Sequence, residues 1–518
     1  MRSTCSTFTR TAALALTLLL FLSSPALASS ADDELTLGVI SVKTTQLNPL
    51  YAEERDFQSL TALIYEGLVS LDDDYRPEAC LAESWESSSD GRLWTFHLRE
   101  NALFHDGTPV TAYDVKATLE EILRLAEESK GQYANLKYIV SSVSAADAQT
   151  VTIKAARPYY GFIYAMTFPI LPQTRLQDAS PSGSGPYQVS RFEPADFLYL
   201  SANDSWWQQI PAIRRVNVVF SATNQALISL YENNSVDAVI TRSSSAGQYS
   251  RSTTSASLTY RTQQLETLMI NNSAMFLDDA NVRLAIRYAI DVDRLVSDAY
   301  QGMAVRTDTP LPQGTWMYQD DPSFSYDPDK ARALLAESGW SDLDGDENGV
   351  LNKVIGGAMK NLHLRLCVYE EQDNSVRVGA ANLIADMLSQ VGFEIKVESV
   401  TFSEASQKLS SGNFDLCLAA FQMDAVPDPG FLLMKGNTGN YSRYRSTEMD
   451  SLFSTLRKSA SQTDYENCLR QIQTQFAKDC PFLCLYYRTG AIMTRKMFTY
   501  ARDVREPCLL RGIESAGN

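Results

Sequence analysis

The chain is organised around the stretch LAESWESSSDGRLWTFHLRENALFHDGTPVTAYDVK, residues 81–116. Its centre alternates between apolar and polar side chains, the apolar ones being Trp94, Phe96 and Leu98. Such alternation predicts a half-buried strand, and the Asp-Gly and His-Asp-Gly sequences at 90–91 and 105–107 predict turns on either side of it. Thr111 stands three residues ahead of Asp114, a capping-box pair that predicts the start of a helix. The stretch therefore predicts a strand, a turn and an amphipathic helix in succession.

The same stretch resembles the signature of family 5 extracellular solute-binding proteins, the peptide and nickel receptors of ABC importers. The family pattern is a W…DG…(Y/W)TF-LR…FHDG-P-TA-DV string. The matching residues are Trp85, Asp90-Gly91, Trp94-Thr95-Phe96, Leu98-Arg99, Phe104-His105-Asp106-Gly107, Pro109 and Thr111-Ala112-Tyr113-Asp114-Val115. So many matches in order make the resemblance specific. The string is expected to build a strand, a turn and a helix, so its residues serve the structure. It therefore identifies the family but does not mark the ligand site.

Further strings along the chain resemble the same family. They are Asn-Pro-Leu at 48–50, Tyr-Glu-Gly-Leu at 65–68, Gly-Ser-Gly-Pro-Tyr at 183–187, VRLAIRYAID at 282–291 and Tyr-Asp-Pro at 326–328. The glycines at 183 and 185 are expected to serve backbone geometry, since a strand follows them and a phosphate cradle needs a helix there. Apolar spacing over residues 281–300 predicts one helix.

The N-terminus has the features of a secretory signal. Arg2 and Arg10 precede an apolar run over residues 12–22, and Pro-Ala-Leu-Ala at 25–28 supplies an A-x-A site. We therefore expect cleavage after Ala28 and an exported protein, periplasmic or at the cell surface. The apolar run is short for a membrane span, and an uncleaved anchor stays open. A formal net charge of −17 argues against binding to nucleic acid or to an anionic membrane surface.

The cysteines that remain after residue 28 are odd in number: Cys80, Cys367, Cys417, Cys468, Cys480, Cys484 and Cys508. An exported chain of this kind keeps at least one free thiol unless two chains pair. A Cys367–Cys417 or a Cys480–Cys508 disulfide stays open. No pair has zinc-site spacing near a histidine, so we expect no metal and no cofactor. All three histidines have structural explanations: His97, His105 and His363.

The segment after residue 361 predicts the architecture. Its strands are expected at 362–369, 393–400 and 414–421, with helices at 380–391 and 403–410 between them. This order with short connections predicts parallel pairing in a doubly wound sheet.

We therefore expect an α/β, two-lobed periplasmic-binding-protein-like fold of type II with an extra subdomain in the first lobe, since 518 residues exceed what one core usually serves. Lobe I covers 34–264 plus 485–518, with the inserted subdomain at approximately 57–175, and lobe II covers 265–484. The chain is expected to cross between the lobes at Leu265–Asn271 and to return at Pro481–Tyr487.

The ligand is expected beyond the carboxyl end of the strand that ends at Phe421, because ligands of open α/β sheets bind there. The residues that follow, QMDAVPDPG at 422–430, resemble the family's W--D(Y)-(D/E)P element. The resemblance implies that Asp424 takes the ligand's α-ammonium group and that Phe421 flanks it. Phe421 replaces tryptophan, and one extra residue separates Asp424 from Pro429, so Asp428 remains a competing candidate.

Three further residues are expected near the ligand. Asn440 and Tyr441 belong to an Asn-Tyr-Ser string that resembles the family's N-(Y)-S before a helix. Tyr51, in the loop after the first strand, is expected to approach from the opposite lobe.

An acidic, glycine-rich loop at 344–349, DGDENG, fits positions 1, 3, 5 and 6 of a calcium loop. Ile355 stands at position 12, where a bidentate glutamate is wanted. We predict a solvated loop, and weak calcium binding at Asp344–Asn348 is the alternative.

The resemblance implies a receptor that closes around an extracellular solute and delivers it to an ABC permease as a monomer, without chemistry. A short peptide is the favoured ligand because Asp424 suits an α-ammonium group. The alternatives within the family are a nickel complex, haem or an oligosaccharide. Outside it the rival is a secreted hydrolase, but the chain has no G-x-S-x-G and no H-E-x-x-H motif. A sensory role for the same fold also stays open.

Overall fold

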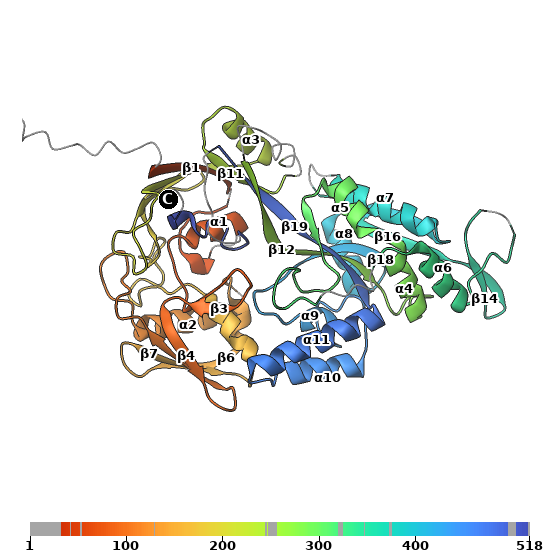
Figure 1. Cartoon of the computed structure of the whole chain (residues 1–518), viewed down its shortest axis with the longest axis horizontal. Coiled ribbons are helices and arrows are strands. Elements are labelled where there is room, and N and C mark those ends of the chain that lie inside the picture. Colours follow the sequence, from red (N-terminus) through yellow and green to blue (C-terminus); the bar gives the residue numbers. More distant parts are fainter. Residues whose placement is uncertain are drawn as a thin grey trace, which may run out of the picture.

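One eleven-stranded sheet runs through both lobes of the protein (Figure 1). The computed structural model describes residues 33–41, 43–51, 54–128, 130–243, 246, 256–319, 325–345, 348–371, 375–495 and 504–515. In spatial order the strands are β17 (Glu394–Val400), β16 (His363–Tyr369), β18 (Leu416–Gln422), β12 (Ala256–Ile270), β19 (Phe482–Thr494), β11 (Ala238–Thr241), β1 (Glu34–Ile40), β10 (Arg215–Ser221), β9 (Phe197–Ala202) and β8 (Tyr187–Glu193); β13 (Ala304–Arg306) pairs with β19.

Two long antiparallel strands, β12 and β19, connect the lobes at the centre of this sheet (Figure 1). The crossings predicted at Leu265–Asn271 and Pro481–Tyr487 lie on these strands but are too short, because both strands continue into the sheet of lobe I. Their pairing is irregular at one point: Arg261 lies opposite Thr489, whereas Leu265 lies opposite Tyr487. Extra residues on one strand form a bulge, which bends and twists the pair locally.

A buried cluster of ion pairs ties both connecting strands to lobe II. Glu266 of β12 and Arg377 of α7 (Val376–Ser389) have no exposed side-chain surface and lie 2.5 Å apart. Arg488 of β19 contacts Glu266 at 2.7 Å, and Glu371 joins both arginines at 2.7 and 3.1 Å. Because breaking a buried pair is costly, these residues hold this part of both strands to lobe II.

Lobe II contains the doubly wound unit that the sequence predicts. β16 pairs with β17 and with β18, in parallel in both cases. The remaining helices of this lobe are α4 (Ala280–Ala289), α5 (Val292–Tyr300), α6 (Pro328–Glu337), α8 (Phe402–Ser411), α9 (Gly430–Leu433), α10 (Thr447–Leu456) and α11 (Gln462–Asp479). A two-stranded hairpin, β14 (Asn352–Ile355) and β15 (Ala358–Asn361), extends from its outer end (Figure 1).

The single helix predicted over residues 281–300 is wrong. The structure has two helices, α4 and α5, because Ile290 is extended (φ −99°, ψ 115°) and ends the first of them. Asp291 then caps the second: its side chain accepts a hydrogen bond from the Arg294 amide at 3.0 Å.

Lobe I combines the other half of the large sheet with a separate subdomain. β1 pairs in parallel with β10 and β11, and α1 (Arg55–Thr61) and α3 (Asn224–Glu232) belong to this half. The subdomain sheet has the order β4 (Ala82–Ser87), β5 (Leu93–Leu98), β7 (Thr150–Ala155) and β6 (Val140–Ala145). The lobe also contains a small pair of strands, β2 (Val69–Leu71) and β3 (Pro77–Ala79), and the helix α2 (Ala112–Glu127). Its 3₁₀ helices are η2 (Pro49–Tyr51), η3 (Ala134–Tyr138), η4 (Tyr160–Thr167) and, near the C-terminus, η6 (Ile513–Ser515). The residue boundaries of the two lobes and of the inserted subdomain stay a prediction.

The signature stretch folds as its pattern predicts. The apolar side chains that alternate along β5 are buried. Asp114 accepts hydrogen bonds from the Thr111 amide at 2.9 Å and from its hydroxyl at 2.6 Å, which completes the capping box of α2. The apolar face of α2 is buried against this sheet, so the stretch forms the core of the subdomain.

The glycines at 183 and 185 allow a close approach of two backbones. A Cβ on Gly183 would lie 2.0 Å from the Ile64 carbonyl oxygen, and one on Gly185 would lie 2.6 Å from that of Leu63. Neither position has room for a side chain, and the strand β8 follows. The prediction that these glycines serve backbone geometry is confirmed.

Candidate ligand-binding site between the lobes

Asp424 lies in the loop after β18 and contacts the opposite lobe. The side-chain amide of Asn135, in η3 of lobe I, donates a hydrogen bond to Asp424 Oδ2 at 2.6 Å. The Asp424 side chain is exposed to water, and neighbouring groups take away part of its hydration. Loss of hydration therefore raises the pKa of Asp424, although the amides of Val426, Ala425 and Asn135 oppose that shift. Asp424 is thus an accessible carboxylate in a confined place between the lobes.

Asp428, the competing candidate, is already paired inside the protein. Its two oxygens accept hydrogen bonds from Arg457 at 2.7 and 3.0 Å. The Gly430 amide donates to it at 3.0 Å and the Tyr159 hydroxyl at 3.3 Å. A carboxylate with this many donors has little capacity left for a ligand cation, so the geometry favours Asp424 over Asp428 for that role.

Phe421 and Tyr441, two of the predicted site residues, come together in the structure. Their rings stack with centroids 6.0 Å apart and an interplanar angle of 27°. Phe431 of α9 packs edge-on against Phe421 at 6.4 Å. These three rings form an aromatic cluster at the end of β18, three residues before Asp424 in the chain.

Asn440 shapes the loop that carries Tyr441. Its Nδ2 donates to the carbonyls of Met434 and Tyr444 at 3.1 and 2.9 Å. Its Oδ1 accepts from the Tyr444 amide at 3.1 Å and from the Ser442 hydroxyl at 3.0 Å. These bonds occupy both amide hydrogens, so Asn440 is placed to position Tyr441 and has no donor free for a ligand.

Tyr51 ends η2 in lobe I and is half-buried against α2. Burial is the main cause that raises the pKa of its hydroxyl, and the acidic side chain of Glu121 adds to that effect. The neighbouring Leu50 carbonyl accepts a hydrogen bond from the Gln132 amide at 3.3 Å, just ahead of η3. Tyr51 therefore lies near the segment that carries Asn135, but no contact among the described residues joins it to Asp424.

Sequence patterns did not point to the lobe I side of this site. Tyr159 contacts Tyr465 of α11, with hydroxyls 3.4 Å and ring centroids 5.8 Å apart. The Tyr465 hydroxyl donates to the Pro427 carbonyl at 2.9 Å. Together with Asn135, these tyrosines hold the loop of Asp424 against lobe I. They lie in no recognisable motif, and only their proximity in the fold identifies them.

Known proteins resemble this chain over most of its length. Residues 76–443 match the model of a family described as bacterial extracellular solute-binding proteins, family 5 Middle. The chain belongs to this family. Among its relatives is the oligopeptide-binding protein AppA of Bacillus subtilis (strain 168), 25% identical over 88% of this chain and 86% of that protein.

Solved structures show the fold of this family 5 protein. The structure of AppA with a nonapeptide covers 93% of this chain and 98% of that one, with a TM-score of 0.65 and 22% identity. NikA of Brucella suis with Fe(III)-EDTA covers 93% and 99%, with a TM-score of 0.76 and 21% identity. The predicted two-lobed periplasmic-binding-protein fold is confirmed. In the part of the chain that the structure describes, no helix is both long and apolar enough to cross a membrane.

The described residues of this solute-binding protein contain no group of three or more metal-ligating side chains placed to hold an ion. His105 contacts the Gly185 carbonyl at 3.0 Å, and His363 contacts Glu394 at 3.3 Å. Asp346 and Glu347 of the calcium-loop pattern lie outside the described residues, as does the predicted signal sequence. The described cysteines are free thiols, although Cys367 lies directly opposite Cys417 on neighbouring strands.

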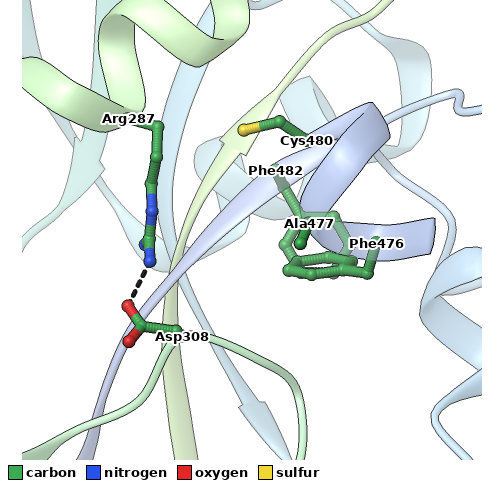
Figure 2. A pocket seen from close by; sticks show the side chains of 6 residues that line it. All are labelled: Arg287, Asp308, Phe476, Ala477, Cys480 and Phe482. Atoms are coloured by element: carbon green, nitrogen blue, oxygen red, sulfur yellow. Dashed lines mark hydrogen bonds and ion pairs between the residues drawn. The ribbon is translucent and has the colours of Figure 1, made fainter. Parts of the chain in front are cut away.

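Two cavities of lobe II lie apart from the residues around Asp424. Figure 2 shows the smaller one, about 10 Å³, between the Arg287–Asp308 ion pair and the Phe476 and Phe482 side chains. That volume has room for about one water molecule. The larger, a groove of about 560 Å³, is lined by polar residues that include Arg283 and Asp479. Neither is lined by any of the five predicted site residues.

Proposed function

We propose that this solute-binding protein is the extracytoplasmic receptor of an ABC importer and that its ligands are short peptides with a free amino terminus. The observation that carries this is the accessible carboxylate of Asp424, which contacts Asn135 of the opposite lobe and follows the strand that ends near the Phe421 and Tyr441 rings. Among the described residues no cation forms an ion pair with this carboxylate, and a peptide's ammonium group would supply one. The likeness to an oligopeptide-binding protein over most of the chain supports the same ligand class.

The remaining parts of the proposal follow from this role. The protein binds and releases its ligand without chemistry, as the receptors of its family do. It works outside the cytoplasm as a monomer that docks on a membrane permease and binds no nucleic acid. Its formal net charge of −17 supports the last point, since like charges repel the phosphate backbone.

A mixed library of di- to hexapeptides, in free and N-acetylated form, tests the ligand class. Wild-type protein should retain the free peptides, as measured by mass spectrometry of the bound fraction, and should retain few acetylated ones. The best-retained peptide then enters calorimetry with Asp424→Asn. Truncating one partner of a buried charge pair costs about 2–5 kcal/mol, which is roughly 30- to several-thousand-fold in affinity.

The mutant should also discriminate far less between the free and the acetylated peptide, because the group that distinguishes them is gone. Glu448→Gln, an exposed acid at the start of α10, is the matched control and should leave both affinities unchanged. Retention of no peptide, or equal retention of free and acetylated peptides, would contradict the proposal and favour a metal complex, haem or an oligosaccharide.

A further inference from the structure

The Asn135–Asp424 hydrogen bond leaves one polar atom of the amide unused. A carboxylate only accepts, so the nitrogen Nδ2 faces Asp424 and the oxygen Oδ1 points elsewhere. Among the described residues no hydrogen bond to Asn135 Oδ1 is found. Both side chains are accessible to water, so this oxygen has room for a partner on a residue that already contacts Asp424.

The segment that carries Asn135 is well anchored in lobe I. Leu136, the next residue, is buried in the core of the lobe with 2% of its surface exposed. The Lys137 ammonium donates to the Ala126 carbonyl near the end of α2 at 3.1 Å. The Leu136 amide bonds to the Tyr133 carbonyl at 3.0 Å, which closes the turn. Asn135 is therefore presented by a fixed turn, and its position relative to lobe II changes only when the lobes move.

We propose that Asn135 is a specificity-determining residue whose Oδ1 is the second acceptor for the ligand's ammonium group, so that the two lobes hold one cation between them. This inference rests on the proposed function. An ammonium group has three N–H donors, so it can use Asp424 as a charged acceptor and Asn135 Oδ1 as a neutral one. An acetylated terminus has a single N–H and no charge, so it gains little from either.

The two acceptors come from residues 289 positions apart, one in each lobe. A cation bound to both is therefore bound more tightly when the lobes are closed than when they are open. A ligand shifts a conformational equilibrium only through such a difference in affinity. Asn135 thus couples recognition of the amino terminus to closure of the cleft.

Calorimetry of Asn135→Ala and Asn135→Asp tests this inference, with the best-retained library peptide in its free and acetylated forms as the probe. Asn135→Ala should weaken the free peptide about 10- to 100-fold, the effect of losing one hydrogen bond to a charged group, and the acetylated peptide less than about threefold. Asn135→Asp keeps an acceptor but loses the N–H group that donates to Asp424, so it should weaken the contact between the lobes and still retain the preference for the free peptide. The control is Asn101→Ala, an exposed asparagine in the turn after β5, which should change neither affinity.

Equal weakening of both peptides by Asn135→Ala would overturn the inference and show that Asn135 only holds the lobes together. No weakening of either peptide would overturn it as well. These outcomes are separate from a failure of the proposed function, in which wild-type protein itself would not distinguish the free peptide from the acetylated one.

Discussion

Glu66 is a buried acid whose carboxyl is expected to be charged only at neutral pH and above. Its Oε1 accepts hydrogen bonds from the indole N–H groups of Trp206 and Trp207, both at 3.0 Å. Its Oε2 is buried without a hydrogen-bond partner, and the nearby Cys80 thiol lies 3.9 Å from Oε1. Burial is the dominant influence and raises the pKa of Glu66 from 4.5 to about 7.

The sign of the effect on stability follows from this shift. Between pH 4.5 and 7 the folded protein holds a proton on Glu66 that the unfolded chain has lost, so its free energy of unfolding falls as pH rises through this window. Above pH 7 both states carry the charge, and the full shift corresponds to a loss of up to about 3 kcal/mol at 1.36 kcal/mol per pKa unit.

Glu66→Gln removes the titration and keeps the contacts. The amide oxygen can accept both indole hydrogen bonds, and the amide nitrogen takes the place of Oε2. The variant should therefore match wild type at pH 5 and be more stable by about 1–3 kcal/mol at pH 8. Urea unfolding at both pH values, followed by tryptophan fluorescence, measures the change as a shift of the midpoint at unchanged slope.

The matched control is Glu83→Gln, an exposed glutamate on β4. Its effect on the midpoint should be the same at pH 5 and pH 8. The urea midpoint of Glu66→Gln should exceed that of wild type by more at pH 8 than at pH 5. An equal difference at both pH values would contradict the raised pKa of Glu66, because Glu66 would then lose its proton equally in the folded and unfolded states.

Two further predictions concern the loop of Asp424 and the thiols. Asp428→Asn breaks the ion pair with Arg457 and should lower the free energy of unfolding by about 3 kcal/mol. The folded variant should still bind the free peptide better than the acetylated one. Loss of that preference at unchanged stability would instead assign the ligand role to Asp428. Alkylation in denaturant without reductant should label all seven cysteines after residue 28, which the structure shows as free thiols. In the native protein the reagent should label at most Cys508, which is half-buried. Two cysteines that resist labelling in denaturant would reveal a disulfide.

Much of the fold follows from local pattern. The alternation at Trp94, Phe96 and Leu98 and the capping pair of Thr111 and Asp114 depend on residues within a few positions of one another, so neighbouring side chains decide their structure. The alternating strands and helices after residue 361 likewise predict parallel pairing, which β16, β17 and β18 show. At Ile290 the apolar spacing predicts a continuous helix, but the backbone is extended there and Asp291 caps a second helix.

The candidate site depends on distant parts of the chain. The sequence favoured Asp424 and Phe421 because they stand at and after the end of a strand in an order that resembles the family's, but it left Asp428 as a competing candidate. Only the tertiary structure pairs Asp428 with Arg457 and brings Asn135 to Asp424 across 289 positions. The physical reason is that a hydrogen bond or an ion pair requires two groups within about 3 Å, and for groups in different lobes that distance is decided by how the lobes pack, which no local pattern records.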